Sequence, residues 1–291
     1  EGITGEKVYF YNIDLLDEQS LIQVFQNHQI KAVIHFAGFK SVAESVSNPI
    51  KYYENNILST INLCKVMHSF GVYNLIFSSS ATVYGNSEEL PLTEDSSTKA
   101  INPYGRSKLM CEEILIDIAN ANNNWKIAML RYFNPVGAHP SGKIGEKPNG
   151  VPNNLMPYIA QVATGKRDFL NVFGNDYPTK DGTGIRDYIH VVDLALGHIA
   201  ALENLDEIDG IDIFNLGTGQ GYSVLEVIKT FEKVNGVRVP YEIVGRRKGD
   251  IAISFADTTK SNTKLSWKAT RKLEDMCRDV WRWESSQLQK S

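Results

Sequence analysis

The chain has 291 residues, enough for one large domain or two of moderate size with a substantial core. A formal net charge of −4 with 42% hydrophobic residues argues against nucleic acid or an anionic membrane surface as the main partner. The three cysteines are widely spaced and form neither a disulfide framework nor a zinc-binding spacing. We therefore expect reduced thiols in a cytoplasmic protein, and no metal site.

Short apolar runs alternate with amphipathic helical patterns through the first half of the chain. Strands are expected at 7–14, 31–38 and 125–137, and a strand that runs into a Ser-rich turn at 74–85. Helices are expected at 17–28, 48–71 and 103–122. This alternation predicts an α/β fold with a Rossmann-like, doubly wound parallel sheet. Ligands of such sheets bind beside the carboxyl ends of the strands, so the loops after these strands are the expected site.

Longer loops rich in Gly, Pro and Asn begin near residue 140 and suggest a second, smaller lobe. We expect 1–139 to form the sheet domain and 140–291 mainly the second lobe, with 187–200 and 211–235 packing back on the sheet. The glycine turn LGTGQGYSV has Tyr222 where a dinucleotide-binding loop needs its third glycine. It is better explained as a tight turn, followed by a helix with a capping box formed by Ser223 and Glu226.

The stretch NPYGRSK places Tyr104 four residues before Lys108, on one face of an expected helix. A free tyrosine has a pKa near 10, and a nearby ammonium together with a cationic cofactor would favour the phenolate, a possible base. The alternative is a buried tyrosine followed by a solvated lysine. Ser80 and Thr82 stand at the carboxyl end of an expected strand, where a hydroxyl could hold a substrate oxygen or simply form a polar turn.

A serine at a strand end followed by YxxxK resembles the short-chain dehydrogenase/reductase superfamily, whose Ser-Tyr-Lys set serves hydride transfer with a nicotinamide cofactor. Nearly the whole chain further resembles the UDP-glucose 4-epimerase family, through HFAGFKSVAESVSNP, SSSATVYGN, LRYFNPVGAHPSG and NVFGNDYPTKDGTGIRDYIHVVDLA. The resemblance implies reversible epimerisation of UDP-glucose and UDP-galactose at C4 with tightly held NAD. The sheet domain would then bind NAD, and the second lobe the UDP-sugar.

By that resemblance Tyr104 is the catalytic base, Lys108 binds the nicotinamide ribose and lowers the tyrosine pKa, and Ser80 hydrogen-bonds the reacting oxygen. The other NAD-site residues it implies are Asp14, Leu15, Phe36, Lys40, Asn55, Tyr132 and Phe133. The substrate-site residues it implies, besides Ser80, are Ala81, Thr82, Asn134, Asn153, Asn154, Leu155, Asn171, Phe173, Arg186, Arg247, Asp250 and Ser254. The small Ser254 would also admit the N-acetyl group of UDP-GlcNAc and UDP-GalNAc.

Several of these residues have simpler structural explanations. Arg186 and Asp187 could form an ion pair, and Asp193 could cap a helix. His35 lies in an apolar run without partners at metal-binding spacing, as does His190, and both are better explained as core histidines. Phe133, like Phe173, could be an ordinary core residue.

The family pattern starts with a strand, a GxxGxxG turn, a helix and a second strand, which this sequence lacks. We therefore expect this chain to be part of a longer protein. The alternative functions are a nucleotide-sugar 4,6-dehydratase or decarboxylase, and a non-catalytic truncated relative. A dehydratase or decarboxylase of this superfamily has an acid beside the strand-end hydroxyl. In this chain Ala81 and Val83 flank Thr82, so no acid stands there. Apolar stripes on the helices at 50–71 and 103–122 suggest a homodimer.

Overall fold

The computed structural model describes residues 2–87, 89–147, 152, 154–247 and 249–288. Within these residues the main sheet has four parallel strands in the order β1, β2, β3, β7. The ladder between β2 and β3 runs from Asn74↔Lys126 to Ser80↔Tyr132, so both strands end at the same level. The strands are β1 (Val33–His35), β2 (Asn74–Ser80), β3 (Lys126–Tyr132) and β7 (Ile211–Leu216).

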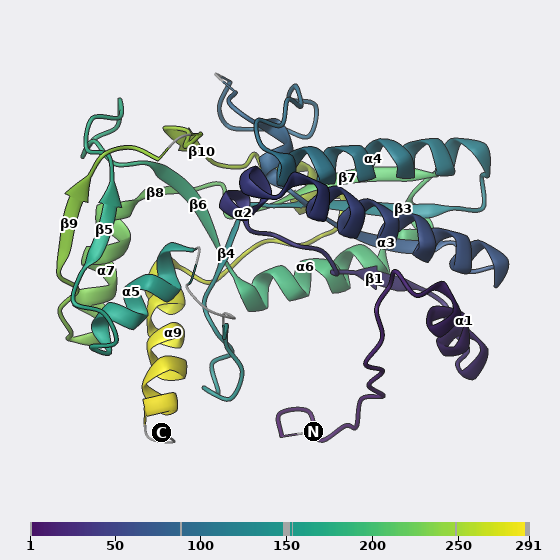
Figure 1. The fold of residues 1–291 in the computed structure, drawn as a ribbon, viewed down its shortest axis with the longest axis horizontal. Helices are drawn as coiled ribbons and strands as arrows, with labels where there is room; N and C mark the ends of the chain where they lie inside the picture. Colours follow the sequence, from purple (N-terminus) through teal and green to yellow (C-terminus); the bar gives the residue numbers. More distant parts are fainter. Residues whose placement is uncertain (1, 88, 148–151, 153, 248, 289–291) are drawn as a thin grey trace.

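Helices cover both faces of this sheet, because successive side chains of a strand point to opposite faces. On β2, Leu75 and Phe77 pack against the layer of α1, α3 and α4, whereas Ile76 packs against α6 and Trp267. Figure 1 shows α3 and α4 together on one side of the sheet and α6 on the other. The expected α/β, doubly wound fold is confirmed. These helices are α1 (Glu18–Asn27), α3 (Pro49–Ser69), α4 (Pro103–Ala121) and α6 (Val191–Glu203).

The strand expected at 7–14 does not form. This segment has no regular secondary structure, and Val8, Tyr9 and Phe10 are exposed. A β-strand needs a neighbour that completes its ladder of hydrogen bonds, and none of the described strands pairs with it. The prediction of a strand at 7–14 is wrong.

The segment expected as one strand at 125–137 contains two. β3 ends at Tyr132, and β4 (Asn134–Val136) leaves the main sheet to pair with β6 (Ile185–His190). Phe133 stands at the bend, and its backbone N–H donates to Leu216 O, 3.1 Å away. The chain therefore passes at this point from the main sheet into a second sheet, made of β4, β6, β8 (Gly221–Ser223) and β10 (Ile253–Ser254).

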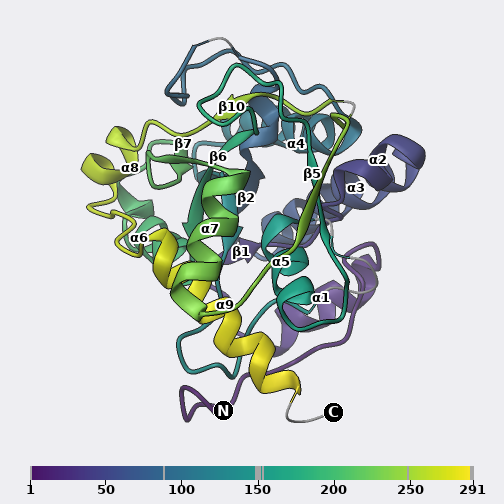
Figure 2. The same ribbon diagram turned by 90° about the vertical axis from the view of Figure 1, so that its left-hand side faces the viewer.

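A group of helices and one pair of strands forms a lobe at one end of the molecule, at the left of Figure 1 and toward the viewer in Figure 2. Its core lies between α5 (Leu155–Ala163), α7 (Val224–Asn235), α9 (Leu273–Leu288) and the pair β5 (Leu170–Phe173) and β9 (Tyr241–Val244). Within the range 211–235, β7 pairs with β3 of the main sheet, whereas α7 packs against α9 through Val227, Ile228 and Phe231. The short helices are α2 (Val42–Ser47), η1 (Ala81–Tyr84), η2 (Leu205–Glu207) and α8 (Thr259–Lys264).

Two expectations about helix starts have different outcomes. The capping box of α7 is confirmed, since Ser223 accepts from the Glu226 N–H and Glu226 accepts from the Ser223 N–H. Asp193 is not a cap, because His190 caps α6. Asp193 is buried in the first turn, where it pairs with Arg271. Among the described helices, none is long and apolar enough to cross a membrane.

Candidate functional site

Tyr104 lies in the first turn of α4, directly above the end of β2. The Asn102 side chain caps this helix by accepting from the Gly105 N–H at 2.8 Å, and Pro103 takes the first helical position, which needs no donor. A side chain on Gly105 would meet the Thr82 carbonyl oxygen at 2.9 Å. Glycine therefore lets the start of α4 approach η1 closely, and this brings Tyr104 to Ser80.

The Ser80 hydroxyl is oriented by its own turn. Its oxygen accepts from the Thr82 N–H at 3.2 Å and from the Thr82 hydroxyl at 3.0 Å. Its own proton is thus free for the hydrogen bond with Tyr104. Burial raises the pKa of Tyr104 above its usual value, and the bond from Ser80 opposes that rise. In this state Tyr104 is a protonated phenol.

Lys108 is buried, so the alternative of a solvated lysine is wrong. Its Nζ donates to the Ser78 carbonyl at 2.8 Å and lies over the Phe77 ring, 5.0 Å from the centroid. Burial lowers the pKa of Lys108 to about 8. The neighbouring carboxylate of Glu112, which is bound by Arg131, opposes this lowering. The Lys108 hydrogen bond points to Ser78 rather than to the Tyr104 phenol.

His35, at the end of β1, is a core histidine as expected. It is 2% exposed, and its Nε2 lies 3.1 Å from the Thr60 hydroxyl. Burial, helped by the charge of Lys108, lowers the pKa of His35 to about 3. His190 is likewise buried, and its Nε2 lies 3.2 Å from Asp279 Oδ2.

The buried imidazole of His35 predicts that the folded state loses stability at acid pH. The unfolded chain takes up a proton on His35 below about pH 6.5, whereas the folded chain does not until about pH 3. Stability is therefore lost as the pH falls below about 6.5, by about 2 kcal/mol at pH 5 for this one group. Urea unfolding at neutral and acid pH should show that His35→Gln removes about this much of the pH dependence. His68→Gln, which removes an exposed imidazole, is the matched control; an equal effect of both changes would contradict the prediction.

The loop after β1 is held by a buried asparagine that sequence reasoning missed. Asn56 accepts from the Phe39 N–H at 2.8 Å and donates to the Phe39 carbonyl at 3.1 Å, while Asn55 donates to its Oδ1 at 3.1 Å. Phe36, which directly follows β1, is 58% exposed. Lys40 pairs with Glu146 at 3.2 Å. The only available signal was the paired asparagines of YYENN.

Asp14 and Leu15 lie at the turn before α1. Asp14 Oδ1 accepts from the Leu16 N–H at 3.0 Å, and the Leu15 carbonyl accepts from the Asn62 side chain at 3.2 Å. Both residues lie at the end of segment 7–14.

A second group of expected residues gathers around two arginines. The Arg247 guanidinium lies over the Phe173 ring at 4.7 Å, and its Nε pairs with Asp250 Oδ2 at 2.9 Å. Arg186 donates to the Ile185 carbonyl at 2.8 Å. Burial lowers the pKa of Arg186; the charges of Tyr188 and Asp250 oppose this, and the charge of Arg247 adds to it. Two guanidiniums close enough to repel each other favour an anion between them.

The suggested Arg186–Asp187 ion pair is wrong, because Asp187 is fully used elsewhere. Its Oδ1 accepts from the Thr218 N–H at 2.9 Å and the Thr218 hydroxyl at 2.6 Å. Its Oδ2 accepts from the N–H groups of Gly219 at 3.0 Å and Ala256 at 3.2 Å. The glycine turn that resembled a phosphate loop thus does bind an anion with its backbone, but that anion is the chain's own carboxylate.

The bend from β3 to β4 connects the hydroxyl and lysine residues near the end of β2 with the arginine group. Phe133 is 4% exposed and packs with Val83, Tyr84 and Leu92, which agrees with the core alternative for this residue. Asn134 is exposed and faces Tyr188 in the ladder between β4 and β6.

The other expected substrate residues lie along the second sheet and the lobe. Ser254 is opposite Arg186 in the ladder between β10 and β6. Asn154 precedes α5 without a capping bond from its side chain, and Leu155 packs on the lobe core. Asn171 is exposed on β5, Ala81 is half-buried in η1, and Asn153 lies outside the described residues.

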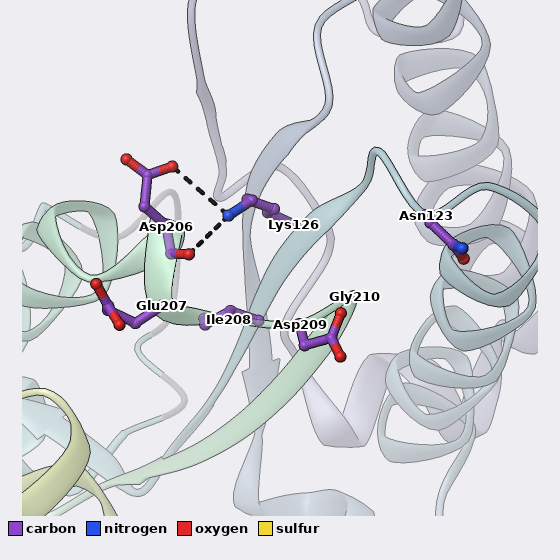
Figure 3. Close-up of a pocket in the computed structure, with 7 residues that line it drawn as sticks. All are labelled: Asn123, Lys126, Asp206, Glu207, Ile208, Asp209 and Gly210. Carbon is purple, nitrogen blue, oxygen red and sulfur yellow. Dashed lines mark hydrogen bonds and ion pairs between the residues drawn. The ribbon is translucent and has the colours of Figure 1, made fainter.

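A pocket of about 260 Å³ lies elsewhere, at the amino ends of β3 and β7 (Figure 3). Lys126 and Gly210 belong to its lining, together with three acidic side chains, and Lys126 Nζ donates to the Asp206 carbonyl at 2.7 Å. Parallel sheets of this kind bind ligands at the opposite, carboxyl ends of their strands. This pocket is therefore separate from the hydroxyl, lysine and arginine groups described above.

Comparisons with known proteins agree with this arrangement. A family model described as GDP-mannose 4,6 dehydratase matches residues 2–280. The UDP-glucose 4-epimerase of Bacillus subtilis is 60% identical over 286 residues, which are 98% of this chain and 84% of that protein. The crystal structure of UDP-glucose-4-epimerase from Stenotrophomonas maltophila, with bound NAD and formylated UDP-arabinopyranose, has a TM-score of 0.97 at 52% identity and covers 100% of this chain and 86% of that one. The crystal structure of UDP-glucose 4-epimerase from Bifidobacterium longum, in complex with NAD+ and UDP, has a TM-score of 0.95 at 52% identity. The match covers 98% of this chain and 85% of that one.

Proposed function

The chain belongs to the UDP-glucose 4-epimerase family of the extended short-chain dehydrogenases/reductases, and we propose that it interconverts UDP-glucose and UDP-galactose at C4 with NAD. The observation that carries this proposal is the pair of Ser80 and Tyr104, joined by a hydrogen bond next to the buried ammonium of Lys108. A phenol that can exchange a proton and a hydroxyl that can hold an oxygen are what an alcohol undergoing oxidation requires.

The carboxyl ends of β1, β2 and β3 fit a nicotinamide nucleotide. The exposed ring of Phe36 offers a stacking surface, and Lys108 holds a buried positive charge with donors suited to ribose hydroxyls. NAD, when bound, supplies the acceptor and donor of hydride for the sugar carbon. Lys108, Tyr132 and Phe133 would hold it at this end, with Asp14, Leu15, Lys40 and Asn55 contributing from the β1 side.

Tyr104 would take the proton of the sugar 4-hydroxyl and later return it. Its pKa is raised in the chain alone, so it needs added positive charge to act as a base near neutral pH. Ser80 would hold the same oxygen with the proton it now gives to Tyr104. Thr82 would keep Ser80 in that orientation through its two hydrogen bonds.

The arginine group suits the diphosphate of a UDP-sugar. Arg186 and Arg247 would bind its oxygens, for which forked guanidinium donors are well matched, and Asp250 would accept from a ribose hydroxyl. Phe173, already packed beneath Arg247, offers a wall for the uracil ring. We assign Asn134 to the diphosphate and Asn153, Asn154, Leu155 and Asn171 to the uridine by family pattern.

A nucleotide-sugar 4,6-dehydratase is the competing function, and the description of the matching family model raises it. Such a reaction removes a second proton and needs an acid or base beside the strand-end hydroxyl. Here Ala81 and Val83 flank Thr82, and neither can exchange a proton. The relatives that share 60% and 54% identity with this chain are named UDP-glucose 4-epimerases, which also disfavours this alternative.

One assay separates the candidate functions. The NAD-loaded protein is incubated with UDP-galactose, and the products are separated by chromatography. Epimerisation yields UDP-glucose until both sugars reach equilibrium. A 4-keto-6-deoxy sugar would instead indicate a dehydratase, and binding of UDP-galactose without any product would indicate a non-catalytic relative.

The substrate range should extend to N-acetylated sugars. Ser254 is buried opposite Arg186, and its small side chain leaves room beside the expected sugar position. We expect wild type to interconvert UDP-GlcNAc and UDP-GalNAc. Ser254→Tyr should lower kcat/KM for this pair by about 5- to 150-fold, since overpacking a well-filled site costs about 1–3 kcal/mol. The control is the same variant with UDP-galactose, which should lose less than about fivefold. Equal losses for both pairs would contradict this prediction.

We further propose a cytosolic homodimer. All three cysteines are free and buried, which suits a reducing compartment. The outer surface of α3 and α4 exposes Ile50, Leu58 and Met110, which a second copy of the chain could cover. Sedimentation of wild type and of Ile50→Glu tests this proposal, and a monomeric wild type would contradict it.

A further inference from the structure

Asn215, near the end of β7, is a buried amide side chain that has no part in the function proposed above. It is 0% exposed, and both of its polar atoms have partners. Its Oδ1 accepts a hydrogen bond from the Tyr84 hydroxyl at 2.6 Å, and its Nδ2 donates to the Leu92 carbonyl at 2.9 Å. One side chain therefore joins the main sheet to η1 and to the loop that follows η1.

The bond from Tyr84 reaches the reaction centre through η1. Ser80 is the N-cap of this short helix, and Tyr84 is its last residue. The Tyr84 ring is buried, and the Arg131 guanidinium lies over it, 4.8 Å from the ring centroid. Because its ring is packed and its hydroxyl is bonded to β7, Tyr84 fixes one end of the turn whose other end orients the Ser80 hydroxyl.

The bond to Leu92 reaches the segment that follows β10. The Leu92 N–H donates to the Phe255 carbonyl at 3.0 Å, and the Leu92 carbonyl accepts from the Asp257 N–H at 2.7 Å. Phe255 directly follows Ser254, the residue assigned above to the space for the N-acetyl group. Asn215 therefore holds Leu92, and Leu92 in turn holds the chain beside Ser254.

We propose that Asn215 is a positioning residue for two parts of the sugar site: its Oδ1 keeps the turn of Ser80 in place, and its Nδ2 keeps the segment of Ser254 in place. A carboxamide suits this task, because it accepts with one atom and donates with the other. Any arrangement that broke either bond would leave a buried polar atom without a partner, which favours a single arrangement. This inference rests on the proposed function, because it deepens the roles given there to Ser80 and Ser254.

The loop around Leu92 has a second attachment that does not involve the Asn215 side chain. Glu94 Oε1 accepts from the backbone N–H of Asn215 at 2.7 Å, and the Glu94 carbonyl accepts from Arg131 Nη1 at 3.0 Å. Asn215→Ala keeps both of these bonds, so we expect this variant to stay folded with a local change. Tyr84→Phe keeps the packed ring and removes only the bond to Oδ1.

These two variants separate the two bonds. Tyr84→Phe should lower kcat about tenfold for UDP-galactose and for UDP-GalNAc, with KM changed less than about twofold, because both sugars need Ser80 at the same oxygen. Asn215→Ala should show the same loss of kcat and also raise KM about tenfold for UDP-GalNAc alone, since only the N-acetyl group reaches the chain beside Ser254. Adding Tyr84→Phe to Asn215→Ala should cause no further change, because the acceptor is already gone.

Asn235→Ala is the matched control. The Asn235 Nδ2 donates to the Cys277 carbonyl at 3.2 Å inside the lobe, so this change also removes an asparagine bond to a backbone carbonyl. We expect kcat and both KM values to stay within about twofold of wild type. If wild type turns over UDP-galactose alone, the inhibition constant of UDP-GalNAc replaces its KM in all variants.

A second readout does not depend on turnover. Amide hydrogen exchange of the purified protein, followed by mass spectrometry, compares the segments 78–86 and 253–258. Tyr84→Phe should speed exchange about tenfold in 78–86 only, and Asn215→Ala should do so in both segments. Asn235→Ala should leave both unchanged.

Three outcomes overturn the inference. They are equal changes of KM for the two sugars in Asn215→Ala, a Tyr84→Phe loss that persists in the Asn215→Ala background, and unchanged exchange in either segment of Asn215→Ala. If wild type lacked epimerase activity, the proposed function would fail, while hydrogen exchange would still decide whether Asn215 fixes both segments.

Discussion

Tyr104→Phe is expected to lower kcat for UDP-galactose epimerisation by three to four orders of magnitude, the upper range for loss of a positioned acid–base group. The change removes one oxygen and keeps the ring that fills the first turn of α4. The sugar 4-hydroxyl then has no base, and Ser80 cannot replace it, since its oxygen is already occupied by two bonds from Thr82. Steady-state kinetics at saturating substrate measure the effect.

The matched control for this variant is Tyr158→Phe, which removes a hydroxyl from a partly buried tyrosine of α5, packed on the core of the lobe. This variant should retain activity within about twofold. Binding of UDP should be unchanged in both variants, because the arginine group lies on other elements. A Tyr104→Phe protein with more than about one tenth of wild-type kcat would rule out Tyr104 as the base.

Arg131→Leu is expected to lower the free energy of unfolding by about 3–5 kcal/mol, because it leaves the buried carboxylate of Glu112 without its positively charged partner. Arg131 binds Glu112 with two hydrogen bonds, at 3.0 and 2.7 Å, and both side chains are almost fully buried. Glu112 also accepts from the Ser79 hydroxyl at 2.5 Å. Without the guanidinium, the Glu112 charge would remain in the core between β2 and α4 with a single donor.

A surface ion pair provides the comparison. Arg278 pairs with Asp275 at 2.7 Å on α9, with both side chains well exposed to water. Arg278→Ala should cost less than about 1 kcal/mol. Urea unfolding of the two variants measures both values. Similar costs for the two changes would mean that burial does not determine the strength of the Arg131–Glu112 pair.

The sequence predicted the elements that carry the reaction centre, because local signals define them. Asn-Pro before Tyr104 marks a helix start, and four-residue spacing brings Lys108 to the same face. The continuous apolar runs of β2 and β3 likewise predict strands covered on both faces. These inferences need only the order of neighbouring residues.

Contacts between segments that are distant in the chain could not be predicted from the sequence. Segment 7–14 has the composition of a strand, but a strand forms only where a neighbouring strand completes its hydrogen bonds. Asp187 looked like a partner for Arg186 and instead binds the turn at Thr218, some thirty residues along the chain. His198 sits in an apolar helix, and its contact with Tyr132 depends on how α6 crosses the end of β3. Such roles depend on tertiary packing, which no local pattern encodes.

The central claim is most directly tested by following the sugar itself. The NAD-loaded protein is mixed with UDP-galactose in deuterated water, and proton NMR records the configuration and the hydrogen at C4. The account predicts that UDP-glucose appears and that its C4 hydrogen comes from the substrate, since Tyr104 exchanges only the hydroxyl proton. Deuterium at C4 of the product, or no conversion by a folded protein that binds both NAD and UDP, would contradict it.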